Sequence, residues 1–260
     1  MADLIPTACS ALPRRHDAPG APVTYWFFDD VVRMVAQCET GGRCEVPGTP
    51  IYRWANRDGQ SFPFPADPNP YGELWPDLAG ALGADGPQAL YSTADSTLLY
   101  AILRPRASGD GPLQIVSFDP EAGGLMNPKE PQEPAELAKA GVSAGMVTAA
   151  CEVELSSTVA LFGHDGSAPV YWRWDQRLQK VSKPTGMPQE VAGPVTAAFL
   201  GYDKTRPGST VKVPRRITRL YAGTREQPFV ITESGGTLTF TPCEAVPFLK
   251  PLNNHVLREE

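Results

Sequence analysis

The alternation of hydrophobic and polar residues along the chain predicts a series of short β-strands. Residues 158–163 read Thr-Val-Ala-Leu-Phe-Gly, and residues 170–175 read Val-Tyr-Trp-Arg-Trp-Asp. Such β-branched and aromatic runs favour strands. Turn sequences such as Ser234-Gly235-Gly236 separate the runs and are typical of hairpins. Helical spacing is confined to residues 134–140, so we expect an all-β protein.

A short motif opens four successive units of this pattern. It begins at Pro22, Pro87, Met146 and Pro194, and the third and fourth copies read Val-Thr-Ala-Ala after the first residue. Spacings of roughly 50 to 65 residues are typical of repeat architectures, and four candidate strands per unit are typical of propeller blades. The pattern predicts a β-propeller of four blades with about four antiparallel strands each. Five blades, one of them degenerate, is the alternative.

The same pattern sets the expected domain boundaries. Residues 1–21 form an N-terminal extension, residues 22–243 a single propeller domain and residues 244–260 a C-terminal tail. Within the domain the four units are expected at approximately 22–86, 87–145, 146–193 and 194–243.

Composition and charge narrow the classes of partner. Hydrophobic residues make up 42% and charged residues 20% of the 260 residues, which is ordinary for a folded domain. The formal net charge of −6 removes the basis for non-specific nucleic-acid binding. No apolar run approaches the ~20 residues that span a bilayer, so we expect neither nucleic acid nor a membrane as partner. The first residues lack a signal-peptide pattern, which favours a cytoplasmic protein unless this end has been trimmed.

Unit three resembles the hemopexin-like family. Residues 147–151 (Val-Thr-Ala-Ala-Cys), 161–163 (Leu-Phe-Gly) and 171–175 (Tyr-Trp-Arg-Trp-Asp) are similar to that family's first, second and third strand elements. The resemblance implies a four-bladed disc that serves mainly as a binding module, with a channel that has room for a structural ion on backbone carbonyls. It also implies a disulfide between the first and last blades, for which Cys9 and Cys243 are placed. Thr stands where the family has Asp on the inner strand, and units one and two match poorly.

Two further cysteines, Cys38 and Cys44, are either bonded to each other or reduced. Cys38 and Cys44 bracket a short glycine-containing loop, which would allow either a hairpin disulfide or two reduced thiols. No Cys/His cluster has zinc-ligand spacing, and we predict no cofactor.

The inner strands of the four units differ in side-chain size. Units one and two place Tyr25, Trp26 and Tyr91 where units three and four place paired alanines. Large groups facing small ones are typical of ordinary core packing. The functional alternative is an off-axis aromatic pocket at the mouth of the channel, because ligand sites are concave and mostly apolar.

The third strands provide a second cluster of aromatic and arginine side chains. Its members are Arg53, Trp54, Trp172, Arg173 and Trp174. Aromatic faces beside an arginine suit a sugar or an anion. The alternative is packing between blades, with the arginines paired to neighbouring carboxylates.

Only weak candidates for acid–base chemistry occur. His164 lies in an expected turn, and Asp29 and Asp30 lie between two strands at the rim of the expected pocket. No nucleophile elbow, glycine-rich phosphate loop or Cys-x-x-Cys motif is present. We therefore expect a small-molecule-binding module for a hydrophobic or cyclic ligand. The alternatives are a cofactor-independent cyclase, isomerase or pericyclase that uses the same pocket, a carbohydrate-binding lectin, and a protein-interaction module.

Overall fold

The computed structural model is all-β, as the alternation predicts, with few helices. It describes residues 7–12, 23–28, 31–36, 51–55, 61–63, 75–83, 86–93, 96–105, 111–120, 124–126, 130–153, 157–166, 168–202, 216–223 and 225–244. For residues 11–12, 23–36, 51–63, 201–202 and 216, the description covers the backbone within these ranges and not the side chains.

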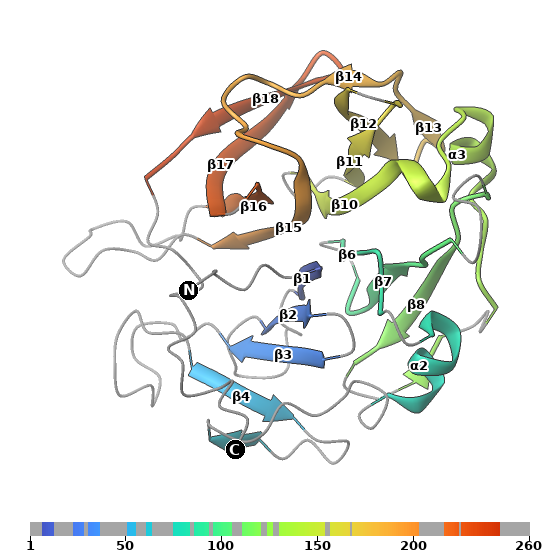
Figure 1. The fold of residues 1–260 in the computed structure, drawn as a ribbon, viewed down its shortest axis with the longest axis vertical. Coiled ribbons are helices and arrows are strands. Elements are labelled where there is room, and N and C mark those ends of the chain that lie inside the picture. Colours follow the sequence, from blue (N-terminus) through green and yellow to red (C-terminus); the bar gives the residue numbers. More distant parts are fainter. Residues whose placement is uncertain are drawn as a thin grey trace.

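The described strands form four antiparallel sheets (Figure 1). The first sheet has the order β1 (Ala8–Leu12), β2 (Val23–Phe28), β3 (Val31–Ala36), β4 (Ile51–Ala55), β5 (Ser61–Pro63). The second has the order β6 (Ala89–Tyr91), β7 (Leu99–Ile102), β8 (Ile115–Asp119), β9 (Gly124–Leu125). The third has the order β10 (Val147–Glu152), β11 (Thr158–His164), β12 (Pro169–Asp175), β13 (Lys180–Val181), and β14 (Thr185–Gly186) also pairs with β12. The fourth has the order β15 (Val195–Tyr202), β16 (Arg216–Ala222), β17 (Arg225–Ser234), β18 (Thr237–Pro242).

Short helical segments lie between these strands. They are α2 (Pro76–Leu82), α3 (Ala135–Lys139) and the 3-10 turn Ala144–Met146. The proline at the start of α2 suits a first helical turn, where its missing N–H has no partner to lose. Leu78 and Leu82 of α2 are buried against the second sheet.

Strands that follow one another in the chain are neighbours in each sheet, because short turns join them. The β17–β18 hairpin shows the chemistry: Ser234 pairs with Thr237 across Gly235 and Gly236. Both glycines have positive φ, at 57° and 87°, as a two-residue hairpin turn requires.

The first strands of the four sheets adjoin one another near the middle of the molecule (Figure 1). β1 contacts β6 and β15, and β10 contacts the same two strands. Polar side chains link neighbouring first strands. Ser10 Oγ of β1 donates to Ser92 Oγ at 3.3 Å, and Thr148 Oγ1 of β10 donates to the Val195 carbonyl of β15 at 2.5 Å. The threonine of the repeated motif thus ties the third sheet to the fourth.

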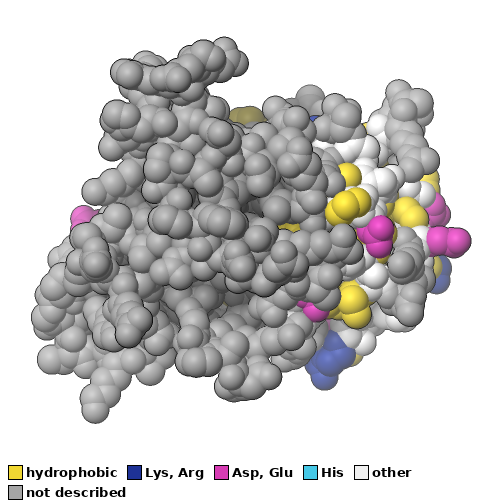
Figure 2. Space-filling view, turned by 90° about the horizontal axis from the view of Figure 1, so that it is seen from below, with side chains coloured by type: hydrophobic (Ala, Val, Ile, Leu, Met, Phe, Trp, Pro, Cys, Tyr) yellow, Lys and Arg dark blue, Asp and Glu magenta, His cyan; other side chains and the backbone are white. Residues whose placement is uncertain are grey.

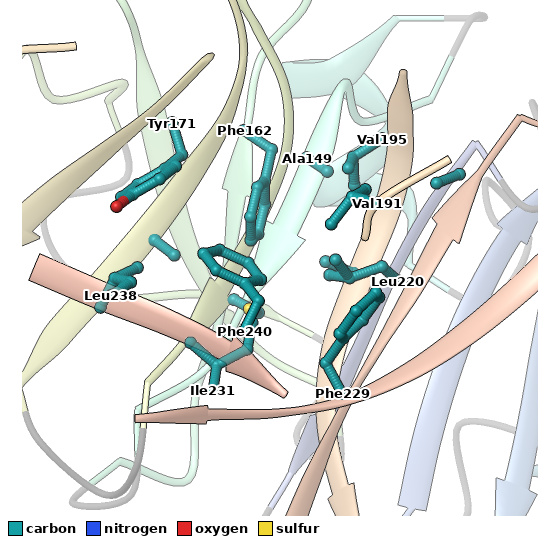
Figure 3. Close-up of a cluster of buried hydrophobic side chains, with 14 of the residues drawn as sticks. Ala149, Phe162, Tyr171, Val191, Val195, Leu220, Phe229, Ile231, Leu238 and Phe240 are labelled. Carbon is teal, nitrogen blue, oxygen red and sulfur yellow. The ribbon is translucent and has the colours of Figure 1, made fainter. Parts of the chain in front are cut away.

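Hydrophobic side chains fill the space between facing sheets. Figure 3 shows this core between the third and fourth sheets, where Phe162 points toward Phe240 and Tyr171 lies on the same side of the core. The ring centroids of Tyr171 and Phe240 are 5.4 Å apart. A second cluster joins the second and third sheets, and a third cluster packs Ala8 of β1 with the second sheet and α2.

The structure corrects the prediction of a β-propeller of four blades, and equally the five-bladed alternative. The sheets are open and antiparallel, none is closed or curled, and they contain four or five strands. They cover one another's apolar faces, which is the packing of a β-sandwich. The repeat determines the strand order within a sheet, but its alternating pattern suits any arrangement in which another sheet covers the apolar face.

The structure also changes which strand of the first unit lies innermost. The comparison of the four repeated motifs predicted residues 23–27 as the innermost strand of the first unit, with Tyr25 and Trp26 on it. Instead β1 adjoins β6 and β15, and β2 is the next strand outward, with Cys9 paired to Trp26 and Ser10 to Tyr25. The first sheet therefore begins inside the range 1–21 that the repeat set apart as an extension. The small residues of β1 suit this crowded position. β1 was not predicted as the innermost strand because residues 23–24 carry the Val-Thr of the repeated motif, which predicts the start of the first unit there.

Candidate functional site

Two of the sequence-predicted binding residues meet at the boundary between the second and third sheets. Tyr91 of β6 stacks on Tyr100 of β7, with ring centroids 4.9 Å apart. Its ring also meets Trp174 of β12 edge-on at 6.0 Å. We call Tyr91, Tyr100 and Trp174 the aromatic junction. The sequence placed Tyr91 and Trp174 in separate clusters, and the tertiary structure joins them.

Local strand geometry positions each ring. Tyr91 and Tyr100 are directly opposite one another in the β6–β7 ladder, where aromatic side chains interact across strands. Trp172 and Trp174 lie two residues apart on β12, so they share one face. That face packs in the core with the second sheet. Tyr91 is only 1% exposed, whereas Tyr100 is half-buried and reaches the surface.

Polar side chains border the aromatic junction. Gln176 Nε2 donates to the Tyr91 hydroxyl at 3.0 Å, and Trp174 Nε1 donates to Glu136 Oε1 at 2.9 Å. Gln176 and Glu136 are both half-buried. An amide and a carboxylate have more hydrogen-bonding positions than these two bonds use. Both side chains can therefore form further hydrogen bonds beside an aromatic surface.

The Tyr91 hydroxyl is a neutral group at this site. Burial raises its pKa well above the ordinary tyrosine value, and Tyr100 adds to the rise, while the hydrogen bond from Gln176 opposes it. A phenol with a raised pKa stays protonated at neutral pH. Tyr91 therefore orders its neighbours through packing and hydrogen bonding and does not supply a negative charge.

The expected aromatic pocket over the alanines is only partly described. The side chains of Tyr25 and Trp26 lie outside the described residues. The alanines of the third and fourth units are buried in contact with other side chains. They are Ala149, Ala150, Ala197 and Ala198. Figure 3 shows Ala149 beside Val195 in the core between two sheets.

The arginine of the third-strand cluster forms contacts between sheets. Arg173 Nη2 of β12 lies 3.0 Å from Glu233 Oε1 of β17, and its Nη1 donates to the Gly236 carbonyl. Trp172 is buried in the core with the second sheet. The backbones of Arg53 and Trp54 lie on β4, and their side chains are outside the described residues.

His164, one of the acid–base candidates, does not join this site. His164 is exposed at the end of β11, opposite Pro169. Asp29 and Asp30 lie outside the described residues. The structure therefore gives no described partner that would make His164 a general acid or base.

A buried polar cluster in the fourth sheet was missed by the sequence analysis. Arg219 of β16 forms an ion pair with Glu226 of β17, and the Tyr221 hydroxyl donates to Glu226 Oε2 at 3.4 Å. Arg219 is 1% exposed. Burial raises the pKa of Tyr221, and Glu226 and Cys9 raise it further. The available signal was a charged residue in the middle of the apolar run 217–222.

Cys9, Cys151 and Cys243 lie within the described residues, and Cys9 and Cys151 carry free thiols. Because Cys9 is a free thiol, the Cys9–Cys243 bridge implied by the resemblance is not formed. Cys38 and Cys44 lie outside the described residues, so their alternatives stay a prediction.

The described residues contain no group of three or more His, Cys, Asp or Glu placed to hold a metal ion. A structural ion held by backbone carbonyls stays a prediction. No described helix is long and apolar enough to cross a membrane.

The described part of the face seen from below carries hydrophobic, acidic and basic side chains intermixed (Figure 2).

No protein-family model and no curated protein matches the chain, but solved structures do. A structure described as a hemopexin fold protein, CP4 from cow pea, has 13% identity and a TM-score of 0.57, covering 94% of this chain and 93% of that one. A plant albumin from Cicer arietinum, described as showing hemagglutination, has 12% identity and a TM-score of 0.57 over 98% and 100% of the two chains. A plant lectin with two metal binding sites, also from Cicer arietinum, has 14% identity and a TM-score of 0.54 over 90% and 89%. At such identities the likeness is one of fold, and it agrees with the hemopexin-like resemblance of unit three.

Proposed function

We propose that this protein is a binding module that recognises carbohydrate at the aromatic junction. The observation that carries the proposal is the meeting of Tyr91, Tyr100 and Trp174 beside Gln176 and Glu136. It brings aromatic rings and spare hydrogen-bonding groups to one place on two sheets.

The burial of each side chain decides which residues would contact the sugar and which would support those residues. Tyr100 is half-buried, so the ring offers a surface on which the apolar C–H face of a sugar stacks. The Gln176 amide donates to or accepts from the sugar hydroxyls, and the Glu136 carboxylate accepts from them, through positions that their present partners leave unused. Tyr91 and Trp174 are buried and hold this surface in place. Sites with an apolar wall and a few oriented polar groups are typical of small-ligand recognition.

The structural comparisons support the same class of function. Among the similar folds, one is described as a lectin and another as showing hemagglutination. Those properties belong to the similar proteins. They make carbohydrate the first ligand class to test here, ahead of the hydrophobic or cyclic ligand expected from the sequence.

The test is a screen against a panel of immobilised mono- and oligosaccharides, followed by calorimetry with the best sugar. Tyr100→Ala removes the stacking surface and should weaken binding tenfold or more, which corresponds to about 1.4 kcal/mol. Tyr100→Phe is the matched control, since it keeps the ring and should bind within a few-fold of the unchanged protein. Gln176→Ala should also weaken binding.

Thermal unfolding of each variant separates loss of the site from loss of the fold. Tyr100→Ala must keep a cooperative transition for the comparison to count. A protein that binds no sugar on the panel contradicts the proposal, and so does one whose affinity is unchanged by both Tyr100→Ala and Gln176→Ala.

A further inference from the structure

The outer strand of the fourth sheet is unlike the outer strands of the other sheets. β18 spans Thr237–Pro242 with the sequence Thr-Leu-Thr-Phe-Thr-Pro and carries no charge. The other outer strands in the described part of the chain are short: β5 has three residues and ends at Pro63, and β9, β13 and β14 have two each. Short strands and prolines are ordinary means of preventing sheets from pairing edge to edge. β18 lacks both over residues 237–241.

The hydrogen-bond pattern shows which backbone groups face the open edge. Ser234 and Thr237 flank a two-residue turn and pair with each other, and the Cys243 N–H donates to the Pro228 carbonyl at 3.1 Å. Antiparallel pairs alternate between bonded and non-bonded kinds. Thr237, Thr239 and Thr241 therefore bond to β17. The backbone N–H and C=O groups of Leu238 and Phe240 point the other way, toward the side on which the described chain supplies no further strand.

We infer that β18 is a dimerisation edge that pairs antiparallel with β18 of a second copy of this chain. A two-fold axis through Thr239 places Leu238 of one copy opposite Phe240 of the other. Both copies then present an N–H and a C=O at each of these positions, so the edge is complementary to itself. The result is a continuous sheet across two protomers with two doubly bonded pairs.

The side chains agree with this pairing. Leu238 and Phe240 are buried in the core of their own protomer, so they hold the strand extended without needing the partner. Thr237, Thr239 and Thr241 are exposed. In the paired edge, Thr239 lies opposite Thr239 of the partner subunit at a non-bonded position, where side chains approach most closely. Threonine pairs are favourable across strands, and no like charges oppose one another.

Sedimentation velocity over a range of concentrations tests the inference on the full chain. We expect the unchanged protein to pass from a monomer of 28.0 kDa toward a species of twice that mass as concentration rises to about 200 µM, a range that detects even weak association. Thr239→Lys places two like charges opposite each other and should weaken association tenfold or more. Ser234→Lys is the matched control, because it adds the same charge to the same hairpin on the strand that is not at the edge. It should associate as the unchanged protein does.

A mixing experiment makes the test specific for the register. Thr239→Lys and Thr239→Glu should each associate at least tenfold more weakly than the unchanged protein when alone, and an equimolar mixture should associate more tightly than either variant, because Lys then lies opposite Glu. A protein that stays monomeric at the highest concentration overturns the inference. So does a Thr239→Lys variant that dimerises as tightly as the unchanged protein, or a mixture that stays monomeric. None of these outcomes bears on sugar binding at the aromatic junction.

Discussion

Gly163 lies where the third sheet leaves no room for a side chain. A Cβ atom at this position would lie 1.8 Å from the carbonyl oxygen of Met146. The residue pairs with Val147, next to an irregularity in the β10–β11 register between Val147 and Ala149. Glycine is used where backbones approach this closely, so the glycine of Leu-Phe-Gly has a packing reason.

Gly163→Ala should therefore destabilise the protein by about 2 kcal/mol or more, because overpacking forces the backbone to move. Gly186→Ala is the control, since a Cβ there has nothing within 4 Å. It should change the free energy of unfolding by less than about 0.5 kcal/mol. Urea unfolding of the two variants and the unchanged protein measures both values, and equal stability of the two variants would contradict the steric explanation.

The buried thiols lead us to expect that the protein becomes less stable at alkaline pH. Burial raises the pKa of the Cys151 thiol well above its ordinary value, and the neighbouring Glu152 adds to the rise. Burial likewise raises the pKa of Cys9. A thiol that ionises only in the unfolded chain leaves stability intact below the unfolded pKa of about 8.5. Above that pH the unfolded state releases the proton and stability falls.

Cys151→Ala removes one such thiol. At pH 7 the variant should be less stable than the unchanged protein, because the substitution leaves a small cavity. From pH 8 to pH 10 the difference should shrink by about 2 kcal/mol, since only the unchanged protein can gain an ionised Cys151 on unfolding. Chemical unfolding at several pH values measures the difference. A constant gap across that range would mean that Cys151 ionises equally in both states.

At the scale of elements, β16 and β17 share a buried ion pair. Arg219 and Glu226 join two neighbouring strands, and Tyr221 lies directly opposite Glu226 in the ladder. Taking charges out of water is costly, and their attraction offsets this cost only while both partners are present. The cluster therefore fixes the two strands relative to each other without being a strong source of net stability.

Arg219→Met should destabilise the protein by about 3 to 5 kcal/mol, because it removes one charge of a buried ion pair and leaves the other behind. The double variant Arg219→Met, Glu226→Gln should regain a large part of that loss, since it removes both charges of the ion pair. A double-mutant cycle from urea unfolding measures the coupling. Additive effects of the two substitutions would show that the ion pair does not couple β16 to β17.

At the scale of the whole molecule, apolar faces between sheets organise the chain. The side chains that fill these spaces were largely readable as inward positions: Trp172 and Trp174 point to one neighbouring sheet and Tyr171 to the other, as the alternation predicts. The sequence did not predict which sheet covers each apolar face, and the propeller prediction was wrong for this reason. A strand with an apolar face specifies burial, but not the partner that provides it.

The candidate site shows the same limit. The sequence predicted Tyr91 and Trp174 as binding residues, but their contact depends on how the second and third sheets pack. Tyr100 of β7, Glu136 of α3 and Gln176 after β12 were missed because half-buried polar and aromatic residues have no periodic signal. The innermost position of β1 was missed for another reason: its partners β6 and β15 are distant in sequence.

The sequence alone determined what depends on neighbours in the chain: the strands, the turns between them and the antiparallel order within each sheet, because alternation and glycine turns act over a few residues. The tertiary structure alone decided which sheets face each other, which strand of the first unit lies innermost and which aromatic rings meet. These depend on the mutual fit of side chains far apart in the chain, and a pattern of period two contains no information about that fit.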